Sequence, residues 1–257
     1  MRSELLYNPR LIVERLALES YRYRRLTRLK NTVAKNLKLG HIDSLEFLDL
    51  ISSEDIKVIY DIGANIGTWS LLAKAIFPNS IIHAFEPLKI HYGEFKKNMQ
   101  DIEEVTLHPV ALGSTSQRNN MNIASFSDAS SLLEIARATE EHFKVYKASE
   151  EEVVVVTLDE YQKRSQIPLP DLIKLDIQGY ELEALKGAIN CLEHTKFIIC
   201  EVSFIEFYKN QPLFEDITCF LDKKGFSIYA LGVNTPLGKR LTQTDVMYIN
   251  NNFKDEL

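Results

Sequence analysis

Charged side chains lie within or at the ends of two apolar runs that read as buried strands. Lys174 lies inside the run Leu172–Ile177, and Asp176 lies near its end. Burying a charge is costly unless it is paired or used in chemistry, and residues two apart in a strand share a face. Lys174 and Asp176 therefore form either a structural ion pair or part of a reactive site. Glu181 follows in the first turn of the next predicted helix, and Glu201 ends the next apolar run, at the same predicted edge.

A turn containing glycine follows another apolar run. The strand Lys57–Ile62 leads through Gly63 to Gly67 into a helix. Glycine permits close approach where a side chain would collide, and such a turn brings backbone N–H groups and a helix N-terminus near a ligand. The dinucleotide fingerprint Gly-x-Gly-x-x-Gly is absent, because the two glycines stand four apart. The candidate ligand-contacting residues are Asp61, Gly63, Ala64, Asn65, Gly67 and Thr68.

An acidic residue follows the next predicted strand. Glu86, which precedes Pro87, lies where a carboxylate can accept hydrogen bonds from both hydroxyls of a ribose. A nucleoside between these strands would contact the glycine turn on one side and Glu86 with Pro87 on the other. Ala111 and Leu112 follow the third strand, where their backbone and apolar side chains could flank an adenine ring.

The elements around these residues alternate between apolar, β-rich runs and helical stretches. The predicted strands are Lys57–Ile62, Ser80–Phe85, Val105–Val110, Leu172–Ile177, Phe197–Val202, Ser227–Leu231 and Asp245–Ile249. The predicted helices are Thr68–Phe77, Leu88–Met99, Tyr180–Cys191 and Leu213–Lys224. We therefore predict an α/β fold of the doubly wound, Rossmann-like kind: a seven-stranded, mostly parallel sheet with helices on both faces and an antiparallel pair at one edge.

These stretches together resemble the FkbM family of class I methyltransferases, from about residue 57 to 205. The matching stretches are Asp61–Gly67, Phe85–Pro87, Ala111–Gly113, Thr157–Asp159, Lys174–Glu181, Leu185–Ala188 and Glu201–Val202. The resemblance implies transfer of a methyl group from S-adenosyl-L-methionine to a hydroxyl, on sugars of glycans or glycolipids or on secondary metabolites. Asn65 stands where many other methyltransferases have a glycine.

Such a transfer needs a base near the acceptor, because a hydroxyl is a poor nucleophile until it shares or loses its proton. We predict Asp176 as this base, with Glu181 second and Glu201 third, and we expect Asp176 to border the cofactor as well. Asp176 and Glu201 could instead hold a divalent metal. No third ligand accompanies them in the sequence, so no metal site is predicted.

Two segments stand outside the regular alternation. Residues 1–50 form a predicted basic helical extension, and residues 1–40 alone carry a charge of +7 in a chain whose net charge is −6. Their basic face could contact an anionic membrane surface or a partner, or pack on its own domain or on the second copy of a homodimer. Residues 113–157 form an insertion within the methyltransferase domain, 51–257, and are predicted to be an acceptor-binding cap, with a structural elaboration as the alternative.

Composition and motifs bear on the class of acceptor, on the compartment and on other possible protein classes. The negative net charge, and the lack of an Asn/Asp-Pro-Pro-aromatic motif or a basic groove after residue 40, argue against nucleic acid and favour a small-molecule or carbohydrate acceptor. The three cysteines lack metal or redox spacing, and no signal peptide or membrane-spanning run is present, so a soluble, cytoplasmic protein is expected. A nicotinamide-dependent oxidoreductase would be expected to carry the Gly-x-Gly-x-x-Gly fingerprint, which this sequence lacks. A non-catalytic cofactor-binding module of the same fold stays open.

Overall fold

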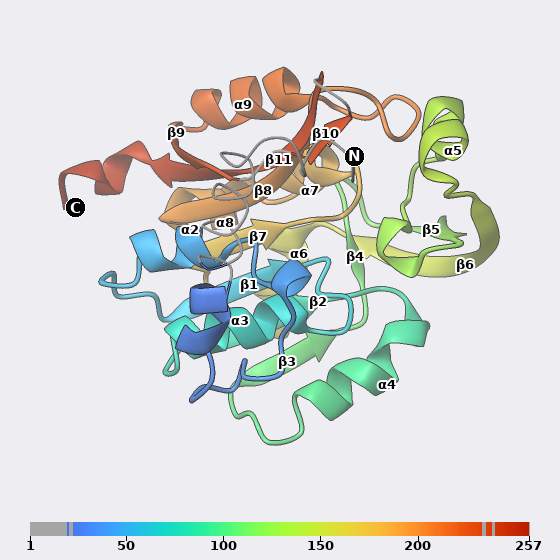
Figure 1. Cartoon of the computed structure of the whole chain (residues 1–257). Helices are drawn as coiled ribbons and strands as arrows, with labels where there is room; N and C mark the ends of the chain where they lie inside the picture. Colours follow the sequence, from blue (N-terminus) through green and yellow to red (C-terminus); the bar gives the residue numbers. More distant parts are fainter. Residues whose placement is uncertain (1–19, 21–22, 233–234, 238–239, 257) are drawn as a thin grey trace.

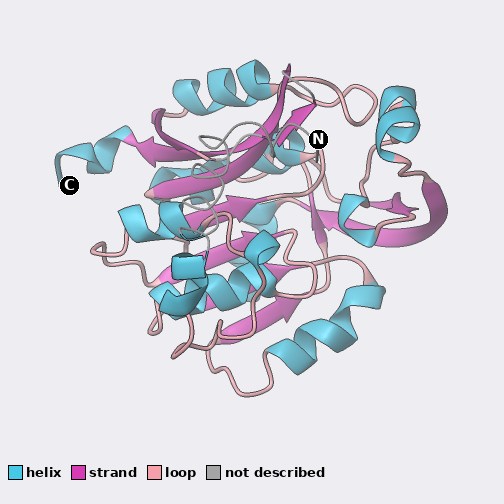
Figure 2. Cartoon of the chain, in the orientation of Figure 1, coloured by secondary structure: helices cyan, strands magenta, loops and turns pink. Residues whose placement is uncertain are grey.

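A mostly parallel sheet forms the centre of the molecule (Figures 1 and 2). The computed structural model describes residues 20, 23–232, 235–237 and 240–256. The strands lie in the order β10-β11-β8-β7-β1-β2-β3, and β9 also pairs with β11. The parallel strands are β1 (Val58–Ile62), β2 (Ile81–Phe85), β3 (Val105–His108), β7 (Leu172–Leu175) and β8 (Phe197–Ser203). The antiparallel strands are β9 (Phe226–Leu231), β10 (Thr235–Leu237) and β11 (Arg240–Asn250). The predicted fold class is confirmed.

Side chains along each strand point alternately to the two faces of the sheet, and each face packs into its own hydrophobic core. In β1, Ile59 points to one face and Tyr60 to the other, and both are fully buried. The first face is covered by α2 (Leu45–Leu50), α3 (Thr68–Ile76) and α4 (Lys89–Asn98). The second face is covered by α6 (Leu158–Ser165), α7 (Glu181–Lys186), α8 (Ile189–His194) and α9 (Phe214–Lys223). Because helices cover both faces, most residues of the parallel strands are apolar.

One predicted helix is interrupted, and one short strand of the main sheet was not predicted. The single helix predicted over 180–191 is broken into α7 and α8, with Gly187 and Ala188 between them. A Cβ atom on Gly187 would lie 2.1 Å from the carbonyl oxygen of Gly113, so this close backbone contact requires glycine. The strand that was not predicted is β10, which pairs antiparallel with the start of β11 and has no apolar run that would indicate it.

The insertion forms a second, small sheet together with the two residues that precede it, in the order β4-β6-β5. Its strands are β4 (Ala111–Leu112), β5 (Gln117–Ala124) and β6 (Lys147–Val156), with η3 (Ser127–Ala129) and α5 (Arg137–Phe143) between β5 and β6. β6 ends in a run of valines, in which Val153 and Val155 are buried while Val154 is 42% exposed. β5 begins with polar residues of low strand propensity and was not predicted, because its pairing with β6 is what stabilises it.

The N-terminal segment is helical only in part. Residues 23–28 are helical, residues 29–36 form turns, and η2 (Leu39–His41) precedes α2. Within the predicted helical extension, residues 1–50, the structure is therefore helical at 23–28, 39–41 and 45–50 but not at 29–38. Leu29 and Leu37 are buried in the same core as β1 and α3.

Much of the basic extension, residues 1–19 and 21–22, lies outside the described residues. Contact with a membrane or a partner through residues 1–40 stays a prediction, as does a homodimer. In the portion of the chain that the structure describes, no helix is long and apolar enough to cross a membrane.

Candidate active site

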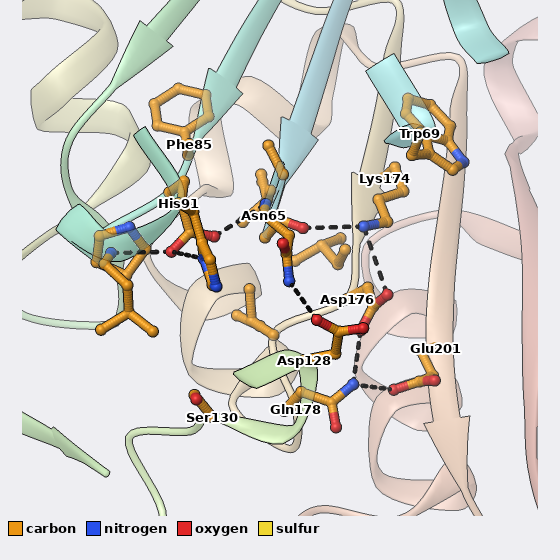
Figure 3. Close-up of a pocket in the computed structure, with 18 of the residues that line it drawn as sticks. Asn65, Trp69, Phe85, His91, Asp128, Ser130, Lys174, Asp176, Gln178 and Glu201 are labelled. Atoms are coloured by element: carbon orange, nitrogen blue, oxygen red, sulfur yellow. Dashed lines mark hydrogen bonds and ion pairs between the residues drawn. The ribbon is translucent and has the colours of Figure 1, made fainter. Parts of the chain in front are cut away.

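A cavity of about 380 Å³ opens at the carboxyl ends of β1, β2, β7 and β8 (Figure 3). Ligands of open α/β sheets bind at this edge of the strands. Most of the predicted site residues line it: Gly63, Ala64, Asn65, Thr68, Glu86, Pro87, Ala111, Leu112, Asp176 and Glu201. The predicted site residues that do not line it are Asp61, Gly67 and Glu181. Each of these three residues instead makes contacts within the protein that stabilise the structure around the cavity.

The turn after β1 is shaped by contacts within the protein. Gly63 has φ +81°, and a Cβ atom there would lie 1.9 Å from the carbonyl oxygen of Asp176. The N–H groups of Gly63 and Ala64 both donate to the carbonyl oxygen of Phe85, at 3.0 and 3.1 Å. We expected these N–H groups to face a ligand, but they join β1 to β2. Gly63 is required because the backbone of Asp176, directly after β7, leaves no room for a Cβ atom at this turn.

Gly67 and Asp61 stabilise the region of the turn after β1 through contacts within the protein. Gly67 has φ +84°, and a Cβ atom there would lie 2.5 Å from Cε of Met99, so glycine permits close packing with the end of α4. Asp61 is completely buried and accepts a 2.6 Å hydrogen bond from Ser70. Burial raises the pKa of Asp61, while the nearby charge of Lys174 opposes that rise.

Glu86 is held in place at the end of β2 and borders the cavity. Its side chain is buried, and its Oε2 accepts a hydrogen bond from the N–H of Asn65 at 2.9 Å. Its Oε1 accepts from the N–H of Leu88 at 2.8 Å. The carboxylate therefore ties the turn after β1 to the end of β2. Each oxygen can still accept a further hydrogen bond from a ligand.

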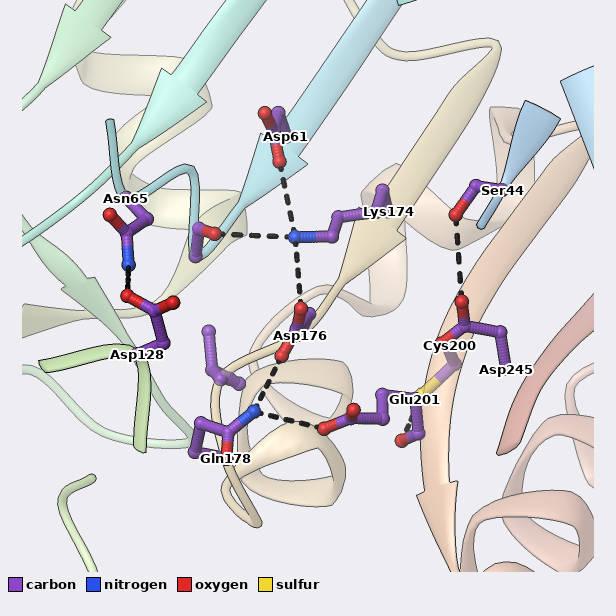
Figure 4. Close-up of polar contacts among 12 residues, drawn as sticks. Ser44, Asp61, Asn65, Asp128, Lys174, Asp176, Gln178, Cys200, Glu201 and Asp245 are labelled. Atoms are coloured by element: carbon purple, nitrogen blue, oxygen red, sulfur yellow. Dashed lines mark hydrogen bonds and ion pairs between the residues drawn. The ribbon is translucent and has the colours of Figure 1, made fainter. Parts of the chain in front are cut away.

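Lys174 lies at the centre of a group of carboxylates (Figure 4). Its Nζ is 3.5 Å from Oδ1 of Asp61 and 3.5 Å from Oδ2 of Asp176, and it donates to the carbonyl oxygen of Gly63 at 3.2 Å. Burial disfavours the ammonium charge, but Asp176 and Asp61 hold the pKa of Lys174 above its ordinary value. The predicted pair of Lys174 and Asp176 thus forms, and Lys174 also neutralises the fully buried Asp61.

Gln178 joins two of the cavity carboxylates, and the sequence did not single it out. Its Nε2 donates to Oδ1 of Asp176 at 2.8 Å and to Oε2 of Glu201 at 3.0 Å (Figures 3 and 4). Its Oε1 accepts a 2.8 Å hydrogen bond from the hydroxyl of Tyr208. Both oxygen partners of Nε2 are acceptors, which determines the orientation of the amide. A neutral residue in a loop carries no charge pattern that would have revealed this role.

Asp245 also lines the cavity and was not predicted as a site residue. It lies directly opposite Glu201 in the antiparallel pairing of β11 with β8. Burial, together with the charge of Asp176, raises the pKa of Asp245 to about 6 and raises that of Glu201 well above its ordinary value. These two carboxyl groups therefore hold protons more tightly than ordinary acids do. Among the residues that the structure describes, no three His, Cys, Asp or Glu side chains are grouped for metal binding.

Glu181 faces the protein interior. Only 2% of it is exposed, and its Oε1 accepts hydrogen bonds from the N–H groups of Ile177 at 2.9 Å and Gly179 at 3.2 Å. Burial raises the pKa of Glu181 to about 7, although these N–H groups oppose the rise. Glu181 therefore stabilises the loop between β7 and α7.

Two further segments, which lie outside the strand-end motifs, also line the cavity. From the insertion come Met121, Ser127, Asp128, Ser130 and Leu132, and from the N-terminal segment come Gly40, His41, Asp43 and Ser44. Asp128 accepts a 3.0 Å hydrogen bond from the side chain of Asn65, and Ser44 donates one of 3.5 Å to Asp245. Both segments lie far in sequence from the residues that they contact.

The family model for the methyltransferase FkbM domain matches residues 61–228, a stretch that begins in β1 and ends in β9. The chain belongs to the FkbM methyltransferase family. The resemblance seen in the sequence is confirmed, and the FkbM match includes every predicted site residue.

Known proteins similar to this FkbM-family chain include two that are named for methyl transfer to carbohydrate groups or hydroxyls. The hexuronic acid methyltransferase AglP of Haloferax volcanii is 28% identical over 63% of this chain, which spans 62% of that protein's length. The 2-O-methyltransferase NoeI of Sinorhizobium fredii is 25% identical over 65% of this chain and 71% of its own length. Among solved structures, the precorrin-6y C5,15-methyltransferase of Geobacter metallireducens aligns with a TM-score of 0.47 and 16% identity, over 81% of this chain and 86% of that one.

Proposed function

We propose that this chain transfers a methyl group from S-adenosyl-L-methionine to a hydroxyl of a sugar, a glycan or glycolipid, or a secondary metabolite. The observation that carries the proposal is that the cavity brings together Glu86, at the end of β2, and Asp176, after β7. A ribose-binding carboxylate and a base are the two groups that such a transfer needs in one cavity. Membership of the FkbM family and the names of the two relatives support the same chemistry.

The cavity residues fit this cofactor. The carboxylate of Glu86 would accept from ribose hydroxyls, while Ala111 and Leu112 would flank the adenine ring. Asn65 borders the same region of the cavity. When bound, the cofactor supplies an electrophilic methyl group on a sulfonium. The cytoplasm remains the expected compartment, since cysteine usage suits a reducing environment.

Asp176 is the base in this proposal. It remains half-exposed at the cavity, with Lys174 on one oxygen and Gln178 on the other. It would accept the hydroxyl proton as the acceptor oxygen bonds to the methyl carbon and the carbon–sulfur bond breaks, which leaves a neutral thioether. Glu201 is less suited because its raised pKa favours the protonated form, and Glu181 does not reach the cavity. The insertion, 113–157, supplies the acceptor-binding cap.

Two measurements test the proposal. Calorimetry with S-adenosyl-L-methionine and with S-adenosylhomocysteine, its demethylated product, should detect binding of both. Incubation with labelled cofactor and a fractionated cell extract should then label a compound that gains the mass of one CH₂ group. Binding without transfer to any acceptor would favour a non-catalytic module, and the absence of any binding would refute the proposal.

A further inference from the structure

His91 is a buried polar side chain on the cavity wall. It lies in the first turn of α4 and is only 5% exposed. Neither ring nitrogen makes a hydrogen bond to any described residue. Buried polar groups are almost always paired, and an unpaired one costs free energy. Nδ1 has the Glu86 carboxylate beside it at 3.3 Å, so Nε2 is the ring nitrogen for which a ligand group would be the partner.

The ring of His91 is oriented by Glu86. Nδ1 of His91 lies 3.3 Å from Oε1 of Glu86. Nε2 is on the other side of an imidazole ring, so it is turned away from this carboxylate. In Figure 3 the ring lies on the wall that also carries Phe85 and Asn65. The Glu86 carboxylate, held by the N–H groups of Asn65 and Leu88, cannot turn toward Nε2 without losing those bonds.

We propose that His91 and Glu86 together bind the two ribose hydroxyls of the cofactor, an inference that rests on the proposed function. A hydroxyl both donates and accepts hydrogen bonds. One hydroxyl of the vicinal diol donates to the Glu86 carboxylate, and its neighbour pairs with Nε2 of His91. This pairing works with either protonation state of Nε2, because the hydroxyl supplies the missing donor or acceptor. His91 is then a specificity-determining residue for a cofactor that carries an intact ribose.

The first test uses calorimetry on the full chain with S-adenosylhomocysteine, so no acceptor is needed. His91→Phe keeps a ring of similar size and removes both nitrogens. We expect it to bind about tenfold more weakly than the wild type, the effect of one lost hydrogen bond. The matched control is His194→Phe, at an exposed histidine of α8 that does not line the cavity, which should bind like the wild type.

The second test compares S-adenosylhomocysteine with its 2′-deoxy and 3′-deoxy analogues. The wild type should bind both analogues more weakly. In His91→Phe, removal of the hydroxyl that pairs with His91 should no longer weaken binding. Removal of the hydroxyl that pairs with Glu86 should still weaken it. If the variant binds the parent ligand weakly but keeps both penalties, the loss is one of packing and the inference fails.

A third measurement does not depend on the phenylalanine variant folding. His91→Gln identifies the imidazole ¹⁵N signals of His91 in the wild-type spectrum by their loss. Those signals should shift when S-adenosylhomocysteine binds, and shift much less with a 2′,3′-dideoxy analogue. Equal shifts with both ligands would overturn the inference. A wild type that binds neither ligand would instead refute the proposed function, so the two failures are distinguishable.

Discussion

The side-chain amide of Asn65 donates a 3.0 Å hydrogen bond to Oδ1 of Asp128, across 63 residues of sequence. Asn65 belongs to the turn after β1, and Asp128 belongs to η3 of the insertion. Both residues line the cavity. This contact therefore joins the predicted cofactor turn to the predicted acceptor cap at the cavity.

Removing this contact should speed the release of the cofactor product. We expect Asp128→Ala to raise the dissociation rate of S-adenosylhomocysteine about fivefold, since one hydrogen bond contributes about 1 kcal/mol. Stopped-flow displacement measures this rate. Asp128→Asn keeps the accepting oxygen and is the matched control, with release expected near the wild-type rate. Equal release rates in all three proteins would show that the contact does not retain the ligand.

Asp176→Asn should abolish methyl transfer while leaving cofactor binding largely intact. The asparagine can still accept from Gln178 but cannot take up the acceptor proton. General-base catalysis contributes about 10²- to 10⁴-fold, so turnover should fall by at least about a hundredfold. Labelled methyl transfer measures the rate, and calorimetry checks that affinity for S-adenosylhomocysteine stays within about threefold. Turnover near the wild-type rate would remove Asp176 from the role of base.

Lys174→Met should destabilise the fold strongly. The substitution leaves the fully buried Asp61 without its cation, and such a loss costs about 3–5 kcal/mol in the free energy of unfolding. Without Lys174 the folded-state pKa of Asp61 rises further. The deficit should therefore be largest above that pKa and shrink as the pH falls and Asp61 takes up a proton. Urea unfolding at several pH values measures it.

The double variant Lys174→Met with Asp61→Asn is the control for that experiment. The introduced asparagine would be neutral and could still accept from Ser70, so the second substitution should restore part of the lost stability. If the double variant is as unstable as the two losses added together, Lys174 acts through packing and not through the charge of Asp61.

Glu181 should make stability depend on pH. Its folded-state pKa is raised by burial to about 7 from the ordinary 4.5, so the folded protein holds this proton more tightly than the unfolded chain does. The contribution is fully present below about pH 4.5 and is lost as the pH rises through about 7, a decrease on the order of 3 kcal/mol.

Glu181→Gln keeps the oxygen that accepts from Ile177 and Gly179 and removes the titration. Its free energy of unfolding should fall less between those pH values than that of the wild type. Urea unfolding across the range compares the two proteins. Identical pH slopes would contradict the raised pKa of Glu181.

The alternating apolar runs were sufficient to predict the parallel strands and most of their helices. β1, β2, β7 and β8 are buried on both faces, so their composition alone indicates buried strands, and the residues just after them fall at one edge of the sheet by topology. Glu86 and Asp176 could be placed at the cavity for this reason. β5 could not be predicted, because its polar residues become a strand only by pairing with β6.

Tertiary structure alone decided which of the predicted groups reach the cavity. From the sequence, Glu181 ranked above Glu201 as a candidate base, yet backbone N–H groups bind Glu181 in the interior while Glu201 lines the cavity. Asp245 and His91 lie in no quoted motif, and Gln178 lies in one without being singled out; the roles of all three depend on which side chains lie within a few ångströms of them. The sequence by itself indicated the family, through the motif stretches that resemble it, and the edge of the sheet that holds the chemistry, because the order of strands and helices follows from local periodicity. The partners of each polar group depend on contacts between distant segments, which no local pattern encodes.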